Sequence, residues 1–181
     1  MVKVIGILGD IGSGKTFIAK QFDCPVFNAD NEVNKIYKKN RSCFNKLKNK
    51  LPKYIKTYPI NKIEISNAIL KNNKNLKKIV SVVHPLVRKE MNLFLKKNIK
   101  KKMVVLDIPL LIENKLYKKN DILIFVQSKK LDILKRLRKR ENFNQKLFNK
   151  FKKIQLPLAY KKKNLDLLLE TILQTNQFEM I

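Results

Sequence analysis

The sequence predicts an α/β protein built around a parallel β-sheet, and three observations lead to this fold class. A short, β-branched apolar run at residues 2–8 passes directly into a glycine-rich turn and then a helical pattern. Two later apolar runs, at residues 103–107 and 121–126, are apolar on both faces, which is typical of strands buried inside a sheet. Helical patterns separate these runs, as crossover helices do between parallel strands.

The first part of the chain alternates strand and helix. A strand is predicted at residues 2–8, a helix at 16–22 and a short second strand at 25–28. Asp30 follows the carboxyl end of that second strand. In open α/β sheets ligands bind at the carboxyl ends of the strands, so Asp30 is expected to lie near the glycine-rich turn.

Residues 31–102 interrupt this alternation. No strand pattern appears there, and apolar residues recur at helical spacing. We predict a helical insertion in which Pro85 occupies the first turn of a new helix, where proline is tolerated. An insertion of this size beside a ligand site commonly binds a second substrate.

The last part of the chain returns to alternating elements. The strands at 103–107 and 121–126 are followed by predicted helices at 129–140 and 144–155. Periodicity leaves residues 165–173 ambiguous, and their place after the last helix favours a fifth strand over a helix.

The charge of the chain is strongly unbalanced. Of 181 residues, 41 are Lys or Arg and 14 are Asp or Glu, which gives a formal net charge of +27. This excess indicates either an anionic partner, such as nucleic acid, a membrane surface or a phosphorylated small molecule, or a drift in composition. We favour drift, because the excess is nearly all lysine and extends from Lys35 to Lys163. Phosphate-binding surfaces commonly use arginine, and only five arginines are present.

Cysteine content and hydropathy exclude several classes of protein. Cys24 and Cys43 are too few for a disulfide framework or a zinc site. No apolar run approaches the roughly 20 residues of a membrane span, and the first run leads straight into the glycine-rich turn, unlike a cleaved signal. The expected location is the cytoplasm.

The glycine-rich turn, Gly9 to Thr16, has the pattern G-x-x-x-x-G-K-[ST] between a predicted strand and a predicted helix. Its backbone N–H groups and the helix N-terminus would face phosphate groups, Lys15 would reach the β- and γ-phosphates, and the Thr16 hydroxyl would bind Mg²⁺. An ordinary turn is the alternative, although three of the four glycines fall within six residues. The residues expected to bind the nucleotide here are Asp10, Ile11, Gly12, Ser13, Gly14, Lys15 and Thr16.

Two acidic residues are candidates for the chemistry of phosphoryl transfer. Asp107 ends a buried strand and would hold Mg²⁺ together with Thr16. Asp30 would accept the proton of a substrate hydroxyl as a general base. The alternative for Asp30 is a helix N-cap, for which Asp is also well suited.

Basic residues offer weaker signals. Arg136 and Arg140 share a helix face at spacing i, i+4 and would close over a triphosphate, but pattern alone favours a solvated helix face. His84 is the only histidine, and a structural role is the alternative to substrate contact. The sequence contains no Ser/His/Asp grouping and no zinc-type spacing.

Taken in chain order, several segments together resemble the dephospho-CoA kinase family. The run Pro-Leu-Leu-x-Glu after the strand ending at Asp107 is the most specific match, because it is unusual among phosphate-loop proteins. The matching segments are 5–16 (IGILGDIGSGKT), 27–30 (FNAD), 83–87 (VHPLV), 107–114 (DIPLLIEN), the pair Arg136 and Arg140, and Gln155.

This resemblance implies transfer of the ATP γ-phosphate to the ribose 3′-hydroxyl of dephospho-CoA, with Mg²⁺. It implies that Asp30 is the base and that Lys15 and Arg140 stabilise the transferring phosphoryl group, with Arg136 on the nucleotide. The fold it implies is a P-loop NTPase with an adenylate-kinase-like core of five parallel strands, a helical insertion and a helical lid. The residues expected at the acceptor are Asp30, Lys62, His84, Pro109 and Leu110.

The same resemblance divides the chain into three parts. Residues 1–30, 103–128 and 156–181 form the nucleotide-binding core, 31–102 the acceptor-binding insertion and 129–155 the lid. The protein is expected to be a monomer or a weak homo-oligomer, without membrane attachment.

Three positions and one segment differ from the family pattern. Asp10 replaces a glycine of the phosphate loop, Asn28 replaces the first acid of an Asp-Ala-Asp segment, and Lys62 stands where an arginine is common. The segment 165–171 keeps Asp166 but loses the family's Ala and Asn.

Two other functions remain open on the sequence. The first is another small-molecule kinase of similar architecture, such as a nucleoside or nucleotide kinase. The second is a nucleic-acid-binding ATPase, which is disfavoured because helicase-type motifs and an aromatic stacking surface are lacking.

Overall fold

The computed structural model describes residues 2–140, 143–162 and 167–170. Its strands form one sheet with the order β2-β3-β1-β4-β5, and every pair is parallel. The prediction of an α/β protein with a parallel sheet is confirmed. The strands are β1 (Lys3–Gly9), β2 (Val26–Asn28), β3 (Met103–Asp107), β4 (Ile122–Gln127) and β5 (Leu167–Glu170).

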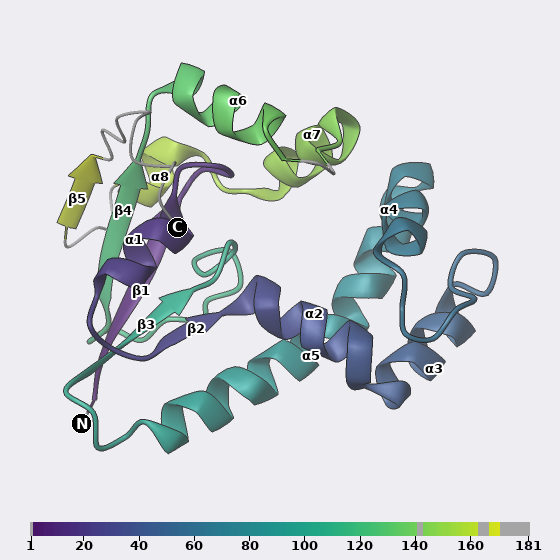
Figure 1. Cartoon of the computed structure of the whole chain (residues 1–181), viewed down its shortest axis with the longest axis horizontal. Coiled ribbons are helices and arrows are strands. Elements are labelled where there is room, and N and C mark those ends of the chain that lie inside the picture. The colour runs from purple at the N-terminus through teal and green to yellow at the C-terminus, as the bar shows by residue number, and fades with distance from the viewer. Residues whose placement is uncertain (1, 141–142, 163–166, 171–181) are drawn as a thin grey trace.

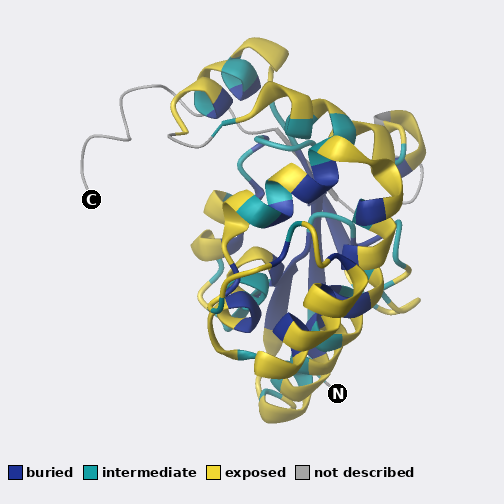
Figure 2. Ribbon diagram, turned by 90° about the vertical axis from the view of Figure 1, so that its right-hand side faces the viewer, coloured by how far each residue is buried: buried dark blue, intermediate teal, exposed yellow. Residues whose placement is uncertain are grey.

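The central strands are buried on both faces, as their apolar composition predicts (Figure 2). On one face, Ala19 of α1 (Lys15–Gln21) packs with Ile5, Ile7 and Val105 in a small cluster. On the other face, strand residues join a larger cluster that continues into the helices between β2 and β3. This second cluster fixes the position of the insertion relative to the sheet.

The region between β2 and β3 is helical, as predicted. It contains α2 (Ala29–Lys39), α3 (Arg41–Lys50), α4 (Lys62–Lys71) and α5 (Asn73–Lys97), which lie beside the sheet in Figure 1. Each helix follows an asparagine whose side chain accepts a hydrogen bond from a first-turn N–H, the arrangement of a stabilising N-cap. These asparagines are Asn28, Asn40, Asn61 and Asn72.

The expected helix start at Pro85 is wrong, because α5 runs through it as a single helix of 25 residues. An interior proline lacks the N–H that would bond to the carbonyl four residues earlier and costs about 3 kcal/mol. Burial of an apolar side chain contributes about 1.5–3 kcal/mol, so the buried face on both sides of Pro85 outweighs this cost. The buried apolar residues of α5 are Ile79, Val82, Val83, Val87 and Met91.

The remaining helices follow β4. Two of them, α6 (Lys130–Arg138) and α7 (Gln145–Ile154), lie close to where the sequence predicts them, and the short α8 (Leu158–Lys162) was not predicted. Lys150 of α7 donates hydrogen bonds to the carbonyl oxygens of Ile69 (2.7 Å) and Leu70 (3.1 Å), so α7 is attached to the end of α4.

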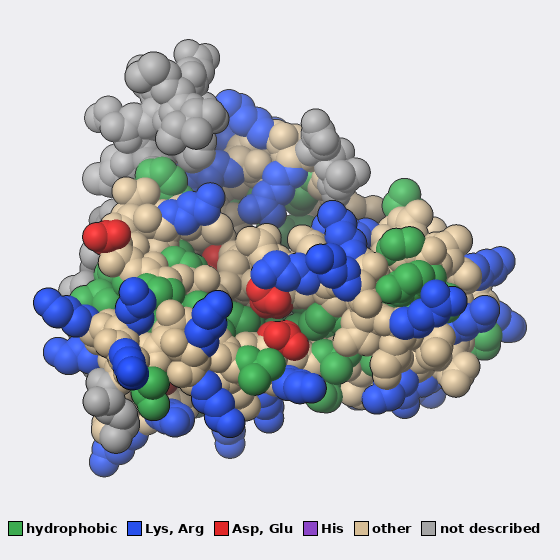
Figure 3. Space-filling view, turned by 60° about the horizontal axis from the view of Figure 1, so that its bottom comes forward, with side chains coloured by type: hydrophobic (Ala, Val, Ile, Leu, Met, Phe, Trp, Pro, Cys, Tyr) green, Lys and Arg blue, Asp and Glu red, His purple; other side chains and the backbone are tan. Residues whose placement is uncertain are grey.

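Two surface properties bear on the possible partners. Lys and Arg side chains are spread over both the sheet side and the helical side of the face shown in Figure 3. Within the described part of the chain, none of the helices combines the length and the apolar character needed to cross a membrane.

Candidate active site

The phosphate loop joins β1 to α1 at the carboxyl edge of the sheet. Gly12 has φ of +84°, a conformation that side chains rarely adopt. A Cβ atom there would also lie 3.1 Å from Leu137 Cγ and 3.2 Å from Ile133 Cγ2, because α6 packs against the loop. Glycine at this position therefore serves both the turn and the packing of α6.

Lys15 is buried at the start of α1 and turned back onto the loop. Its Nζ donates to the carbonyl oxygens of Asp10 (2.6 Å) and Gly9 (3.2 Å). Burial lowers the pKa of Lys15 to about 8, and the Asp107 carboxylate opposes this shift most strongly. The charge of Lys15 is therefore sensitive to its surroundings near neutral pH.

Asp10, the residue that departs from the family pattern, folds back onto its own loop. Its Oδ1 accepts a hydrogen bond of 2.8 Å from the Ile11 N–H. The carboxylate therefore accepts the Ile11 N–H, one of the loop amides that we expect to donate to phosphate.

Thr16, Asp107 and Asn28 meet beside the loop. Asn28 and Asp107 are partners in the β2–β3 register. Asp107 Oδ2 accepts hydrogen bonds of 2.6 Å from both Thr16 Oγ1 and Asn28 Nδ2. The expected pairing of Thr16 with Asp107 thus holds in space, and Asn28 is an additional member that the sequence did not assign.

This oxygen-rich group suits Mg²⁺. Mg²⁺ is commonly held by one or two carboxylates together with substrate phosphates, rather than by a cage of protein ligands. Among the described residues, no group of three or more His, Cys, Asp or Glu side chains could hold a metal alone. Thr16 and Asp107 fit a metal that is shared with a nucleotide.

Asp30 lies in the first turn of α2, two residues after the cap. The N-cap role is filled by Asn28, whose side chain accepts the Asn31 N–H at 2.8 Å. Loss of surrounding water raises the pKa of Asp30, and the Asp107 carboxylate raises it further. Lys15, Arg140 and Lys62 act in the opposite direction. The charges of one carboxylate and three cations therefore act on Asp30, and their balance with the loss of water leaves its pKa raised.

A cavity of about 480 Å³ opens beside Asp30. Most of its wall is apolar and comes from α2, α4 and α5, with polar groups at a few points. This composition is typical of a small-molecule site. The expected site residues that line it are Ile11, Asp30, His84, Pro109, Leu110 and Arg140.

His84 lies on the α5 side of this cavity. Burial and the nearby Arg88 lower the pKa of His84, while a hydrogen bond with the Asn114 side chain opposes the shift. Lys62 is not among the lining residues, but it begins α4 and its charge acts on Asp30. Gln155 also lines the cavity, and its Nε2 donates to the Pro109 carbonyl at 3.4 Å.

Arg136 lies in α6 and Arg140 lies just after its C-terminal end, and the two side chains have different surroundings. Arg140 lines the cavity and acts on Asp30. Arg136 instead donates from one Nη atom to the Gly12 carbonyl and to Ser128 Oγ, each at 3.2 Å. Arg136 therefore holds the backbone of the phosphate loop, a contact that helix periodicity does not reveal.

Glu113, in the loop after β3, forms a buried ion pair with Lys161 of α8. Glu113 Oε1 accepts Lys161 Nζ at 2.7 Å and the Leu156 N–H at 3.0 Å. Lys161 is only 1% exposed, and its charge also acts on Lys15. Sequence reasoning recorded Glu113 only as part of a motif and did not single out Lys161. The expectation for Asp166 lies outside the described residues.

Comparison with known proteins agrees with this geometry. A relative from Wolbachia pipientis wMel, named dephospho-CoA kinase, is 32% identical over 173 residues, covering 93% of this chain and 88% of the relative. A crystal structure from Thermus thermophilus matches with a TM-score of 0.76 and 24% identity, over 94% of this chain and 88% of that chain. A dephospho-CoA kinase from Campylobacter jejuni matches with a TM-score of 0.65 and 20% identity, over 94% and 89%.

The family model described as dephospho-CoA kinase matches residues 3–176, which is nearly the whole sequence. The matched range includes the phosphate loop, Asp30 and Asp107. The chain therefore belongs to the dephospho-CoA kinase family.

Proposed function

We propose that the protein transfers the γ-phosphate of ATP to the ribose 3′-hydroxyl of dephospho-CoA and so forms CoA. Family membership supports this reaction and acceptor. The observation that carries the site assignment is the position of Asp30, which borders the 480 Å³ cavity and is electrostatically coupled to both Lys15 and Asp107. We assign Asp30 as the base, Lys15 as the phosphate-binding lysine and Asp107 as the metal-binding acid, and their mutual electrostatic influence supports this assignment.

In the proposed reaction the acceptor oxygen attacks the γ-phosphorus and its proton passes to the Asp30 carboxylate. The bond between the γ-phosphorus and the β,γ-bridging oxygen breaks, and ADP leaves with the electron pair. Lys15 and Arg140 compensate the negative charge of the phosphoryl group, and the loop amides orient it. Mg²⁺, when bound with the nucleotide near Thr16 and Asp107, neutralises phosphate charge.

We assign the parts of the chain accordingly. The sheet and α1 are the core of an adenylate-kinase-like fold with five strands, and residues 31–102 bind the acceptor. Residues 129–155 form the lid. Two features support the lid assignment: Arg140 and Phe151 line the acceptor cavity, and Lys150 attaches α7 to the end of α4.

An assay of ADP release with and without dephospho-CoA tests the activity. ADP release is expected to depend on dephospho-CoA, and CoA is expected as the second product. In Asp30→Asn we expect turnover to fall by about 10²–10⁴, with ATP affinity nearly unchanged, because a general base contributes about that factor. Asp23→Asn is the matched control, since Asp23 is exposed and lies outside the cavity. Normal turnover in Asp30→Asn would rule out its assignment as the base.

A further inference from the structure

The phosphate loop carries an acidic side chain, Asp10, whose contacts are all with donors of the same loop. Its carboxylate accepts a hydrogen bond of 2.8 Å from the Ile11 N–H. Its carbonyl oxygen accepts Lys15 Nζ at 2.6 Å and the Ser13 N–H at 3.1 Å. Asp10 is half-buried, so its negative charge is only partly surrounded by water. An acid in this position places negative charge in a loop that is expected to bind phosphate groups.

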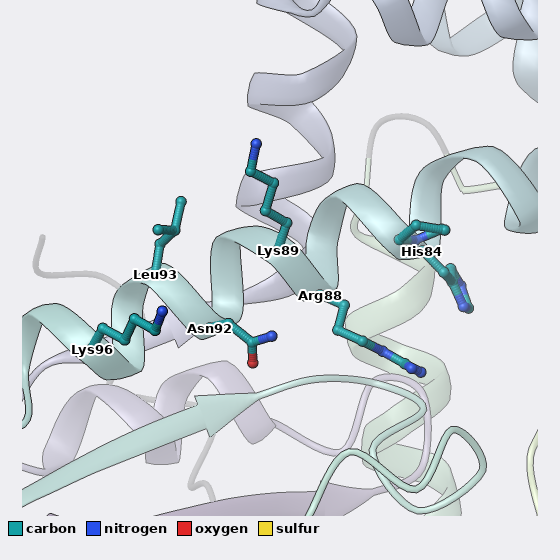
Figure 4. A pocket seen from close by; sticks show the side chains of 7 residues that line it. His84, Arg88, Lys89, Asn92, Leu93 and Lys96 are labelled. Atoms are coloured by element: carbon teal, nitrogen blue, oxygen red, sulfur yellow. The ribbon is translucent and has the colours of Figure 1, made fainter.

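No cation neutralises Asp10 by direct contact within the described part of the chain. The two ion pairs found there lie on α2 and between α8 and the loop after β3, and neither includes Asp10. Cations are present nearby, because the adjacent residue Ile11 lines the cavity beside Asp30 together with Arg140 and Arg88. Arg88 projects from α5, as Figure 4 shows. Asp10 is thus an unpaired acid at the border of a space that cations line.

The charge of Asp10 also acts on the lysine of the loop. Burial lowers the pKa of Lys15, and Asp10 is one of three carboxylates that oppose this shift, of which Asp107 has the largest effect. Asp10 therefore already supplies Lys15 with part of the negative charge that a phosphate group would bring. A phosphate that approaches Lys15 comes near this like charge, and repulsion between like charges weakens binding.

We propose that Asp10 is an affinity-determining residue of the phosphate loop and weakens the binding of ATP by competing with its phosphate groups. The competition has two parts, because the carboxylate accepts the Ile11 N–H and its charge repels phosphate oxygens. The backbone of Asp10 still belongs to the loop around the nucleotide, so only the side chain opposes binding. This inference rests on the proposed use of the loop for ATP.

The proposal makes the effect of Asp10 depend on the charge of the ligand. Repulsion grows with the negative charge that approaches the carboxylate. It is therefore larger for metal-free ATP than for ATP with Mg²⁺, because the metal neutralises part of the phosphate charge. A metal-binding role for Asp10 would give the opposite dependence, since loss of the carboxylate would then weaken binding of the Mg²⁺ complex.

Calorimetric titration of the full chain with ATP, in the absence of the acceptor, tests the proposal. Asp10→Asn keeps an oxygen that can accept the Ile11 N–H but removes the charge. In this variant the dissociation constant of metal-free ATP, measured with a chelator present, is expected to fall about tenfold. With excess Mg²⁺ the expected fall is only about two- to threefold, and added salt is expected to reduce both differences by screening.

Asp23→Asn is the matched control, because it removes the same charge from an exposed position just after the C-terminal end of α1. It is expected to leave both dissociation constants unchanged. The proposal is overturned if Asp10→Asn does not tighten the binding of metal-free ATP, if Asp23→Asn tightens it equally, or if Asp10→Asn weakens binding only when Mg²⁺ is present. Absence of CoA formation by the unaltered protein would instead refute the proposed function, which turnover measures separately from ATP binding.

Discussion

Removing the charge of Glu113 is expected to destabilise the folded protein strongly, because it leaves the ammonium of Lys161 buried without compensation. Lys161 Nζ lies 2.7 Å from Glu113 Oε1, and Lys161 is 1% exposed. In Glu113→Gln the amide oxygen can still accept the bonds from Lys161 and from the Leu156 N–H, so the change mainly removes charge. Breaking a buried ion pair from one side costs about 3–5 kcal/mol.

For a chain of this length, such a loss corresponds to a fall in Tm of roughly 6–20 °C, since each kcal/mol shifts Tm by about 2–4 °C. Urea denaturation followed by circular dichroism measures the free energy of unfolding directly. Glu32→Gln is the control, because Glu32 and Lys35 are also 2.7 Å apart but lie at the surface, where ion pairs contribute about 0–1 kcal/mol.

The double variant Glu113→Gln, Lys161→Met decides the mechanism. If the cost comes from an uncompensated buried charge, replacing Lys161 as well restores part of the lost free energy, and the double variant is more stable than the sum of the single changes implies. Strictly additive losses, or a loss in Glu113→Gln no larger than in Glu32→Gln, would refute this reasoning.

Two further predictions concern the phosphate loop. Because the pKa of Lys15 is lowered to about 8, its ammonium loses the proton as the pH rises through that value. We therefore expect kcat/KM for ATP to decline above about pH 8 in a pH–rate profile. A flat profile to about pH 10 would contradict this. Gly12→Ala is expected to cost about 1–3 kcal/mol in urea denaturation and to raise the KM for ATP, because the residue has φ of +84° and its Cβ would press on Leu137.

The parts of the fold that follow from local sequence were predicted with small errors. The strands ending near Gly9, Asn28 and Asp107 are short apolar runs, and their meeting at one edge follows from the parallel arrangement. The start of a helix at Pro85 was wrong because local proline rules do not include the tertiary burial of the helix face on both sides of it.

At the site, the contacts between segments far apart in the sequence could not be predicted from local patterns. The loop, Asp30 and Asp107 carry recognisable patterns, whereas helix periodicity alone favours a solvated face for Arg136, which in the structure bonds to the Gly12 carbonyl. Lys161 is one of many lysines, and only its burial against Glu113 distinguishes it. Asn28 was noted as a departure from a family acid, yet it caps α2 and bonds to Asp107.

The carbonyl oxygens of the phosphate loop share a property that bears on how ATP enters. Those of Gly9 and Asp10 accept Lys15, that of Gly12 accepts Arg136, and that of Ser13 accepts Ser128. The loop is thus held in shape by side chains before any nucleotide arrives, which spares the binding step the entropy of ordering it. To donate to a phosphate, Lys15 must release its hydrogen bonds to the carbonyl oxygens of Gly9 and Asp10. Nucleotide binding therefore replaces carbonyl acceptors of the Lys15 ammonium with phosphate oxygens.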